Sequence, residues 1–168
     1  ARVMELGAGL GLPSLLCCGL ASRVVSCDLN PQAVAKLREL YTARGLGATA
    51  TAHQLSWTEA GALAELAAAE RVEVLLLADV VYPMKETASL LAALARLRER
   101  LPGLTTLLSI TKRDTAHADQ FLAELSALCP DEGPAAMVGA EVEKGTDPLY
   151  GPCRVFVYSL PPSNRQVC

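Results

Sequence analysis

The 168-residue sequence predicts one α/β domain with a doubly wound, Rossmann-like mixed sheet of seven strands that closes with an antiparallel hairpin. Three observations support this fold class. Short apolar segments alternate with amphipathic helical segments, which is typical of right-handed βαβ units. The first apolar segment runs directly into three closely spaced glycines and then a helix. The last two apolar segments are separated by a Gly/Asp/Pro loop rather than a helix, which favours an antiparallel pair.

The individual elements follow from the apolar pattern. Strands are predicted at residues 3–6, 23–27, 48–55, 72–80, 105–111, 135–142 and 153–160. Helices are predicted to begin at residue 12, and at residues 31–44, from after residue 58 to 70, 86–100 and 116–128. Asn30 is a good N-cap for the second helix, with Pro31 at its first position. The run 72–80 is apolar throughout, which predicts a central strand buried on both faces.

Composition excludes several classes of protein. Hydrophobic residues make up 51% and charged residues 20%, so the chain can form a core and disorder is excluded. The formal net charge is −3 and no Lys/Arg stripe occurs, so we expect no nucleic-acid partner, whereas a basic protein substrate remains compatible. The apolar run 10–21 is too short for a membrane span, so no membrane association is expected.

The cysteines and histidines indicate neither disulfides nor metal. Six cysteines show no C-x-x-C pairing, which favours buried, reduced thiols of an intracellular protein. His53 and His117 have no suitably spaced Cys, His or acidic partners, so no metal site is predicted.

The turn after the first strand is the most informative motif. Glu5 lies near the end of the strand, and Gly7, Gly9 and Gly11 follow at alternate positions before the helix. Such glycines allow a sharp turn and a close approach of a ligand to the backbone. A dinucleotide-binding turn would have a third glycine at position 12, where this chain has leucine. The spacing therefore favours a different nucleotide-like ligand.

Four further residues follow strands at the same predicted edge of the sheet. Asp28 ends the second strand, where an acid can accept both hydroxyls of a ribose, although Asp-x-Asn-Pro is also ordinary turn chemistry. Trp57, the sole tryptophan, follows the third strand and would suit the edge of an adenine pocket or simple packing. Asp79 and Tyr82 follow the fourth strand, where capping and packing are the alternative roles.

These motifs together resemble the seven-β-strand, class I S-adenosylmethionine-dependent methyltransferases, and within them methyltransferase family 16. The resemblance rests on the glycine turn, the L-x-W element at Leu55–Trp57 and the D-x-x-Y element at Asp79–Tyr82, and it runs from Val3 to about Leu128. Members of that family are intracellular protein-lysine methyltransferases that modify non-histone proteins such as chaperones and translation factors. The resemblance thus implies the class I methyltransferase fold, S-adenosyl-L-methionine as cofactor and a protein substrate.

The resemblance also assigns residues. It places Asp79 and Tyr82 beside the transferring methyl group and the target side chain. It assigns the cofactor to Glu5, Gly7, Gly9, Gly11, Asp28, Leu29, Trp57 and Ala78.

The remaining expectations concern the whole protein. We expect a cytoplasmic and also nuclear location, and a single methyltransferase domain over residues 1–168 that lacks its N-terminal segment, because the first strand begins within a residue or two of Ala1. The sequence leaves two alternatives open. One is a class I methyltransferase that acts on a small molecule or another side chain, and the other is a catalytically silent module that binds the cofactor.

Overall fold

The computed structural model describes residues 1–82, 87–112, 115–128, 138–147, 151–160 and 162. The strands in these ranges are β1 (Arg2–Leu6), β2 (Arg23–Asp28), β3 (Ala50–Gln54), β4 (Val74–Ala78), β5 (Thr105–Lys112), β6 (Val138–Asp147) and β7 (Gly151–Leu160). The helices are α1 (Leu12–Cys17), α2 (Pro31–Ala43), α3 (Ala60–Ala69), α4 (Thr87–Arg100) and α5 (Thr115–Ala127), with a short 3-10 helix, η1 (Trp57–Glu59), before α3.

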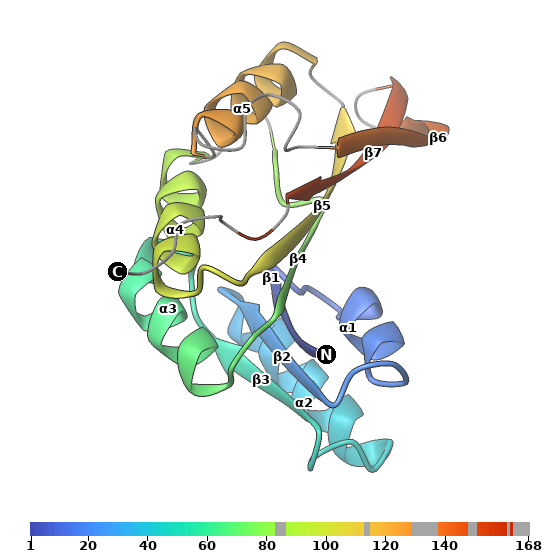
Figure 1. Cartoon of the computed structure of the whole chain (residues 1–168). Helices are drawn as coiled ribbons and strands as arrows, with labels where there is room; N and C mark the ends of the chain where they lie inside the picture. The colour runs from blue at the N-terminus through green and yellow to red at the C-terminus, as the bar shows by residue number, and fades with distance from the viewer. Residues whose placement is uncertain (83–86, 113–114, 129–137, 148–150, 161, 163–168) are drawn as a thin grey trace.

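All strands of the described residues belong to one sheet, in the order β3-β2-β1-β4-β5-β7-β6 (Figure 1). The first five strands are mutually parallel, whereas β7 runs antiparallel to both β5 and β6. The order reverses between β1 and β4, which makes the carboxyl ends of these two strands the place where an open α/β sheet binds ligands. The predicted doubly wound mixed sheet with a closing hairpin is confirmed.

Local sequence sets the start of α2 as predicted. Asn30 has an extended backbone, and its side-chain oxygen accepts a hydrogen bond from the Gln32 N–H at 2.9 Å. Pro31 occupies the first helical position, where its missing N–H leaves no helical hydrogen bond unmade. This cap fixes the beginning of α2 directly after the end of β2.

The helices form two unequal layers on the sheet (Figure 1). Helices α3, α4 and α5 lie together on one face, and α1 and α2 lie on the other, against β1, β2 and β3. The predicted inner face of α4 is confirmed, because its four leucines are all buried: Leu90, Leu91, Leu94 and Leu97. The main core therefore lies between the sheet and the larger layer, and a smaller core lies under α2.

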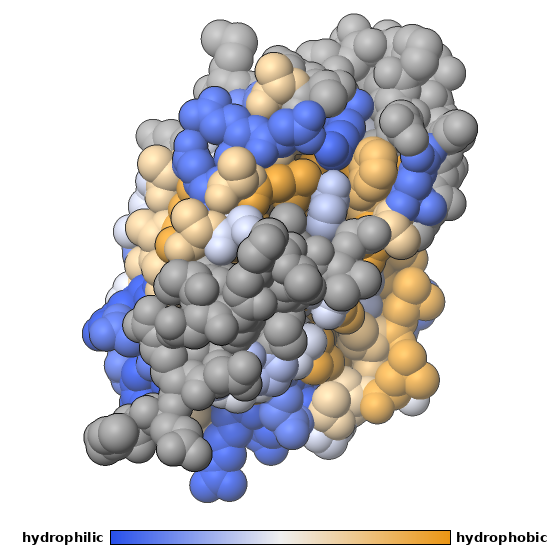
Figure 2. Space-filling view, turned by 45° about the horizontal axis from the view of Figure 1, so that its top comes forward, coloured by the Kyte–Doolittle hydropathy of each residue, from blue (hydrophilic) through white to orange (hydrophobic). Residues whose placement is uncertain are grey.

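The prediction that the fourth strand is buried on both faces is wrong. Leu75 and Leu77 are fully buried, but Leu76 between them is only half-buried. In the described part of the chain, α1 and α2 cover β1 to β3 and leave the neighbouring face of β4 and β5 with a shallow apolar hollow of about 300 Å³, lined in part by Leu76 and Leu107. Figure 2 shows apolar surface gathered along one side of the molecule, the side where Figure 1 places α1.

The closing hairpin differs from its prediction at its first strand. β6 begins at Val138 and continues to Asp147, five residues beyond the predicted end at 142, with an irregular register between Glu141 and Glu143. The predicted start at 135 lies outside the described residues. The last residues of β6 are polar, and the apolar pattern therefore did not indicate them. They can still form a strand because β6 is at the edge of the sheet, where pairing needs no apolar alternation.

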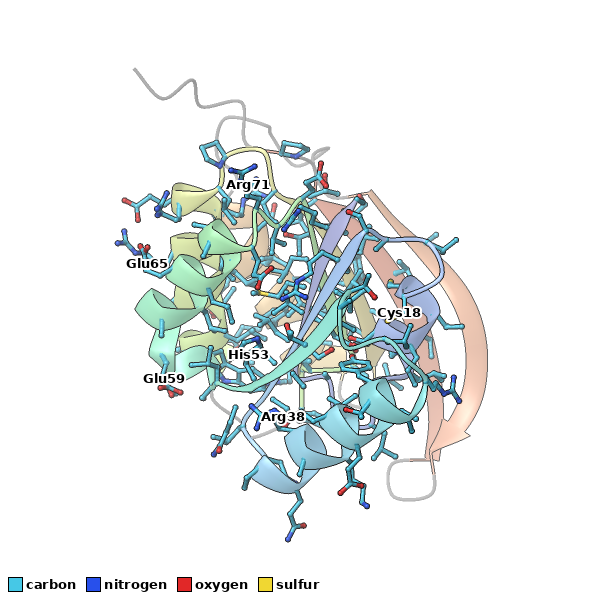
Figure 3. The ribbon with its side chains drawn as sticks, turned by 90° about the horizontal axis from the view of Figure 1, so that it is seen from below. Cys18, Arg38, His53, Glu59, Glu65 and Arg71 are labelled. Atoms are coloured by element: carbon cyan, nitrogen blue, oxygen red, sulfur yellow. The ribbon has the colours of Figure 1, made fainter. Side chains whose placement is uncertain are left out.

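Helix α3 ends in an unusual way. Arg71 has a positive φ of 53°, its N–H donates to Ala68 O at 3.0 Å, and the Val72 N–H donates to Ala67 O at 2.9 Å. This pattern is a Schellman motif, whose left-handed position is usually glycine. Figure 3 shows Arg71 and Glu59 at opposite ends of this helical segment, so Arg71 lies at the edge of the sheet away from the carboxyl ends of the strands.

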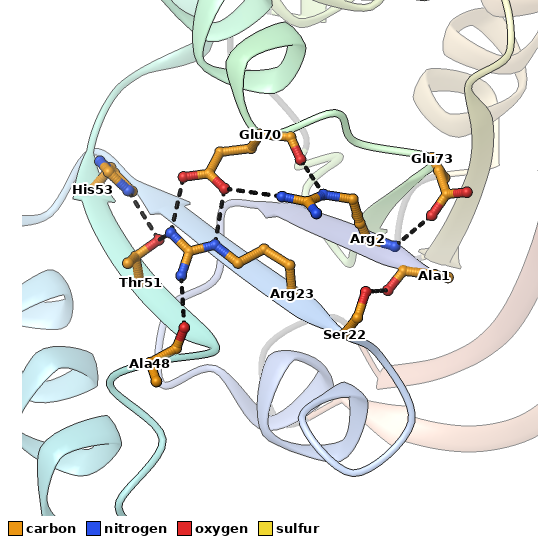
Figure 4. A network of polar contacts seen from close by, with 9 residues as sticks. All are labelled: Ala1, Arg2, Ser22, Arg23, Ala48, Thr51, His53, Glu70 and Glu73. Carbon is orange, nitrogen blue, oxygen red and sulfur yellow. Dashed lines mark hydrogen bonds and ion pairs between the residues drawn. The ribbon is translucent and has the colours of Figure 1, made fainter.

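A polar network holds that amino-terminal edge (Figure 4). The Arg23 guanidinium, on β2, donates to both carboxylate oxygens of Glu70, each at 2.8 Å. The Arg2 N–H, on β1, donates to Glu73 at 2.8 Å. Because Glu70 follows α3 and Glu73 precedes β4, these contacts tie two strands to the α3–β4 connection. The network is structural and lies at the opposite edge from the predicted site.

Candidate cofactor and active site

The predicted site residues come together at the carboxyl edge of the sheet. They lie at the carboxyl ends of β1, β2 and β4 or in the connections that follow β1 to β4, and these four strands are adjacent in the sheet. In an open parallel sheet this edge is the ligand-binding side. Contact of each residue with a cofactor stays a prediction.

The glycine turn is held in place by packing and by backbone hydrogen bonds. Gly7, Gly9 and Gly11 all have positive φ, of 68°, 52° and 72°. A Cβ added to Gly7 would lie 2.8 Å from Val80 Cγ1, and one added to Gly11 would lie 2.2 Å from Leu37 Cδ2. One added to Gly9 would meet no atom within 4 Å. The outer glycines thus permit close packing, while Gly9 borders open space that a ligand can fill.

Asp28 connects the glycine turn to the turn that follows β2. One carboxylate oxygen accepts the Gly9 N–H at 2.7 Å, and the other accepts the Asn30 N–H at 2.7 Å. The Asp28 carbonyl also accepts the Leu55 N–H at 3.1 Å, which links the second turn to the third. Since each carboxylate oxygen can accept more than one hydrogen bond, Asp28 keeps acceptor capacity for ribose hydroxyls. Leu29 beside it is 66% exposed.

Glu5 lies beneath the turn rather than on its surface. It is 1% exposed, and one carboxylate oxygen, Oε2, accepts hydrogen bonds from both the N–H (3.0 Å) and the hydroxyl of Ser14. Burial raises the pKa of the Glu5 carboxyl, and the hydrogen bonds from Ser14 act in the opposite direction. Glu5 therefore fixes the start of α1 relative to β1, whatever it also does for a ligand.

Trp57 is positioned by a capping box. The Ser56 hydroxyl accepts the Thr58 N–H at 3.2 Å, and the Glu59 carboxylate accepts the Ser56 N–H at 3.0 Å. The indole is half-buried, and its Cζ3 atom would lie 3.5 Å from a Cβ on Gly7. The ring therefore lies beside the glycine turn, where it can form one wall of an adenine pocket.

Asp79 has a strained backbone at the end of β4. Its φ is 56°, a left-handed conformation that non-glycine residues rarely adopt. The Thr111 N–H donates to Asp79 Oδ1 at 3.2 Å, and the Asp79 N–H donates to Ser109 O at 2.9 Å. Such strain persists where the surrounding structure enforces it, and it is common at active sites. Ala78 precedes it and is half-buried.

Tyr82 lies three residues further on and is 45% exposed. Val80 and Val81, between the two predicted catalytic residues, are buried at 6% and 3% exposure. The buried pair anchors the D-x-x-Y segment, so Asp79 and Tyr82 flank it at the carboxyl edge. Residues 83–86, which follow Tyr82, lie outside the described part of the chain.

The described residues include three free thiols, but neither a metal-binding cluster nor a membrane-spanning helix. Cys17, Cys18 and Cys27 are free thiols, but only Cys27 is buried as predicted, because Cys17 and Cys18 are half-buried on α1. Burial raises the pKa of Cys27 to about 12. Cys129 and Cys168 lie outside the described residues. No group of three His, Cys, Asp or Glu side chains among the described residues could hold a metal ion. No helix in the same ranges is long and apolar enough to cross a membrane.

Sequence reasoning missed several residues that shape this site. The pattern Ser56-x-x-Glu59 is a capping-box signature, so the sequence contained that signal. Ser14, Ser26 and Val80 carried no comparable signal, because their roles depend on contacts between elements distant in sequence.

The donors and acceptors of the site fit an S-adenosylmethionine-like ligand. Gly9 borders open space, and the carboxylates of Glu5 and Asp28 lie below and beside the turn. Asp28 can accept hydrogen bonds from ribose hydroxyls, as an acid at this position does in many nucleotide-binding sheets. The carboxylate of Glu5 beneath the turn attracts an ammonium and repels a pyrophosphate. The residues from Leu6 to Pro13 include no Lys or Arg that would neutralise one.

Sequence comparison identifies the family. The model of the lysine methyltransferase family matches residues 1–127. The chain is also 29% identical over 129 residues to a protein-lysine N-methyltransferase, EFM3, of Chaetomium thermophilum, in a match that covers 73% of this chain and 38% of that protein. It therefore spans well under half the length of this curated relative. The chain belongs to the lysine methyltransferase family.

Solved structures agree on the fold. An rRNA methylase from Streptococcus thermophilus matches with a TM-score of 0.61 and 14% identity, over 95% of this chain and 87% of that one. A protein titled precorrin 8w decarboxylase, from Methanobacterium thermoautotrophicum, matches with a TM-score of 0.62 and 17% identity, over 95% and 80%. At such identities the likeness concerns the fold alone. Family and fold together imply S-adenosylmethionine as the cofactor.

Proposed function

We propose that this protein transfers a methyl group from S-adenosylmethionine to the ε-amine of a lysine in a non-histone protein. The observation that carries the proposal is the strained Asp79 at the carboxyl edge of β4, followed by the half-exposed Tyr82, in a chain of the lysine methyltransferase family. The name of the Chaetomium thermophilum relative supports a protein acceptor. Following the family, the acceptor is a chaperone or translation factor, met in the cytoplasm or nucleus.

The cofactor supplies a methyl group on a sulfonium, so that a new N–C bond forms as the C–S bond breaks and sulfur keeps the electron pair. The attacking lysine must first lose a proton, because an ammonium has no lone pair. Desolvation and a neighbouring positive charge both lower the pKa of a lysine, so release of that proton to solvent needs no strong base.

The residues of this protein then act by positioning the lysine amine. Asp79 accepts a hydrogen bond from the incoming amine and is itself held by the Thr111 N–H, which limits its movement. Tyr82 lines the path of the lysine side chain beside it, and its hydroxyl holds the amine in line for the transfer. Alignment of two reactants can lower a barrier by about 7–11 kcal/mol in favourable cases, so two orienting groups suffice for a large acceleration.

The test separates binding from transfer. Protein is incubated with methyl-labelled S-adenosylmethionine and cell lysate, and modified residues are identified by mass spectrometry. We expect methyl-lysine on one or a few proteins. Asp79→Ala and Tyr82→Phe should lower the labelling at least tenfold while they leave the affinity for S-adenosylhomocysteine within about twofold, because both act on the acceptor side.

Two other labelling results would replace the proposal. Label confined to small molecules would replace the proposal with a methyltransferase of another acceptor. No label, despite saturable cofactor binding and a lysate of the matching species, would favour a silent binding module. The variant Tyr158→Phe serves as the control, because Tyr158 is a buried residue of β7 that packs in the main core.

A further inference from the structure

Four buried polar side chains form a continuous chain beneath the glycine turn. The Tyr41 hydroxyl, on α2, lies 2.6 Å from Ser26 Oγ on β2, which lies 2.6 Å from Ser14 Oγ on α1. Ser14 in turn donates to Glu5 Oε2 on β1. All four residues are at most 2% exposed, and Glu5 and Ser26 are register partners on adjacent strands.

The protons in this chain have only one consistent order when Glu5 is ionised. A carboxylate accepts hydrogen bonds and donates none, so the single hydroxyl hydrogen of Ser14 points to Glu5. The Ser26 hydroxyl must therefore donate to Ser14 Oγ. The Tyr41 hydroxyl must then donate to Ser26 Oγ. All the hydroxyl dipoles point the same way, toward the carboxylate, and such chains strengthen each bond in them.

We propose that Ser14, Ser26 and Tyr41 are positioning residues that keep Glu5 ionised and fixed under the glycine turn, where its charge selects a ligand carrying an ammonium. The proposal rests on the proposed cofactor site and deepens it. Oε2 receives both bonds from Ser14, and no residue that the structure describes donates to the other oxygen, Oε1. That oxygen is therefore the one that can accept a hydrogen bond from the ammonium of the methionine moiety.

The surroundings make this support necessary. Desolvation raises the pKa of Glu5, and the negative charge of Asp28 on the neighbouring strand raises it further. The other titratable groups facing it are the thiol of Cys17 on α1 and the phenol of Tyr41 on α2, both neutral at pH 7. The two hydrogen bonds from Ser14 are thus the described interactions that favour the charged form.

The experiment compares two ligands on the same variants. S-adenosylhomocysteine carries the ammonium, and 5′-methylthioadenosine keeps the nucleoside and sulfur but lacks the amino-acid part. Ser14→Ala should weaken the binding of S-adenosylhomocysteine about tenfold, because it removes a hydrogen bond made directly to the charged Glu5. Tyr41→Phe should weaken this binding about threefold, because Tyr41 acts on Glu5 only through Ser26 and Ser14. Neither variant should change the affinity for 5′-methylthioadenosine by more than about twofold, since the nucleoside side is untouched.

The pH profile gives an independent readout. Affinity for S-adenosylhomocysteine should fall as pH drops through the pKa of Glu5, and Ser14→Ala should move this loss to higher pH, because it removes a bond to the ionised form. Thr106→Val is the matched control. It removes a hydroxyl that is equally buried, on β5, and has no hydrogen-bond partner within the described structure, so neither ligand should respond.

Two results would overturn the proposal, and they differ from each other. If the variants lower the affinity for both ligands in the same proportion and leave the pH profile unshifted, the hydrogen bonds of Ser14, Ser26 and Tyr41 only stabilise the turn. If the unmodified protein binds neither ligand while circular dichroism shows it folded, the cofactor site itself is wrong. Circular dichroism of every variant at each pH distinguishes unfolding from lost affinity.

Discussion

Three glycine-to-alanine substitutions separate the stability of the glycine turn from its ligand contact. Gly9, Gly11 and Gly45 all have positive φ, of 52°, 72° and 68°. An added Cβ meets nothing within 4 Å at Gly9 or Gly45, but it lies 2.2 Å from Leu37 Cδ2 at Gly11. Only Gly9 and Gly11 belong to the turn, and Gly45 follows α2 at a distance in sequence from the predicted site.

The magnitudes follow from these contacts. A left-handed backbone costs a non-glycine residue about 1–2 kcal/mol, so Gly9→Ala and Gly45→Ala should each lower the free energy of unfolding by about that amount. Gly11→Ala adds the displacement of the buried Leu37, and overpacking costs about 1–3 kcal/mol, so its total is about 2–5 kcal/mol. Gly9→Ala alone should combine a small loss of stability with a large loss of affinity, at least tenfold for S-adenosylhomocysteine, because its methyl group enters the ligand space.

The assay is urea unfolding without ligand, followed by calorimetric titration with S-adenosylhomocysteine on variants that circular dichroism shows to be folded. Gly45→Ala is the control, since it imposes the same backbone strain where no ligand is predicted. Equal affinity of Gly9→Ala and Gly45→Ala for the ligand would refute the conclusion that Gly9 borders the cofactor.

Three further predictions concern other parts of the molecule. Arg71→Gly should raise the free energy of unfolding by about 1 kcal/mol, because glycine adopts the left-handed end of α3 without strain, whereas Arg71→Ala should not. Hydrogen bonds from Arg23 lower the pKa of Glu70 below its ordinary value of 4.5, so this stabilisation is complete above that pH and is lost as pH falls through the lowered pKa. Unfolding at pH 3 to 6 should show this loss, of about 1 kcal/mol or less, and Glu70→Gln should remove this contribution while the other carboxylates still titrate. The fluorescence of Trp57 should change on titration with S-adenosylhomocysteine, and an unchanged spectrum would leave it a packing residue only.

The sequence was sufficient for most of the fold because the signals were local. Asn30 with Pro31 marked the start of α2, and the leucines of α4 marked its inner face. The glycine turn was equally visible, because closely spaced glycines indicate a backbone with positive φ values, and the structure has them there. The carboxyl edge followed from the alternation of strands and helices.

What the sequence could not predict depends on contacts between separate elements. The apolar run of β4 predicted burial on both faces, but burial depends on which face the helices cover, and here Leu76 is only half-buried. The polar end of β6 carried no strand pattern because an edge strand needs none. Glu5 was predicted as a ligand contact, and its bond to Ser14 arises only when β1 and α1 pack together. The left-handed backbone of Asp79 likewise has no signature in the sequence.

The central claim is that the glycine turn, Asp28 and the edge of β4 form a site for an ammonium-bearing nucleoside. The most direct measurement is calorimetric titration of the unmodified protein with S-adenosylhomocysteine and, separately, with NAD⁺. We predict saturable one-to-one binding of S-adenosylhomocysteine and no measurable binding of NAD⁺, because the Glu5 carboxylate beneath the turn would repel a pyrophosphate and position 12 is leucine instead of the third glycine of a dinucleotide-binding turn. Saturable binding of NAD⁺ without binding of S-adenosylhomocysteine would contradict the claim.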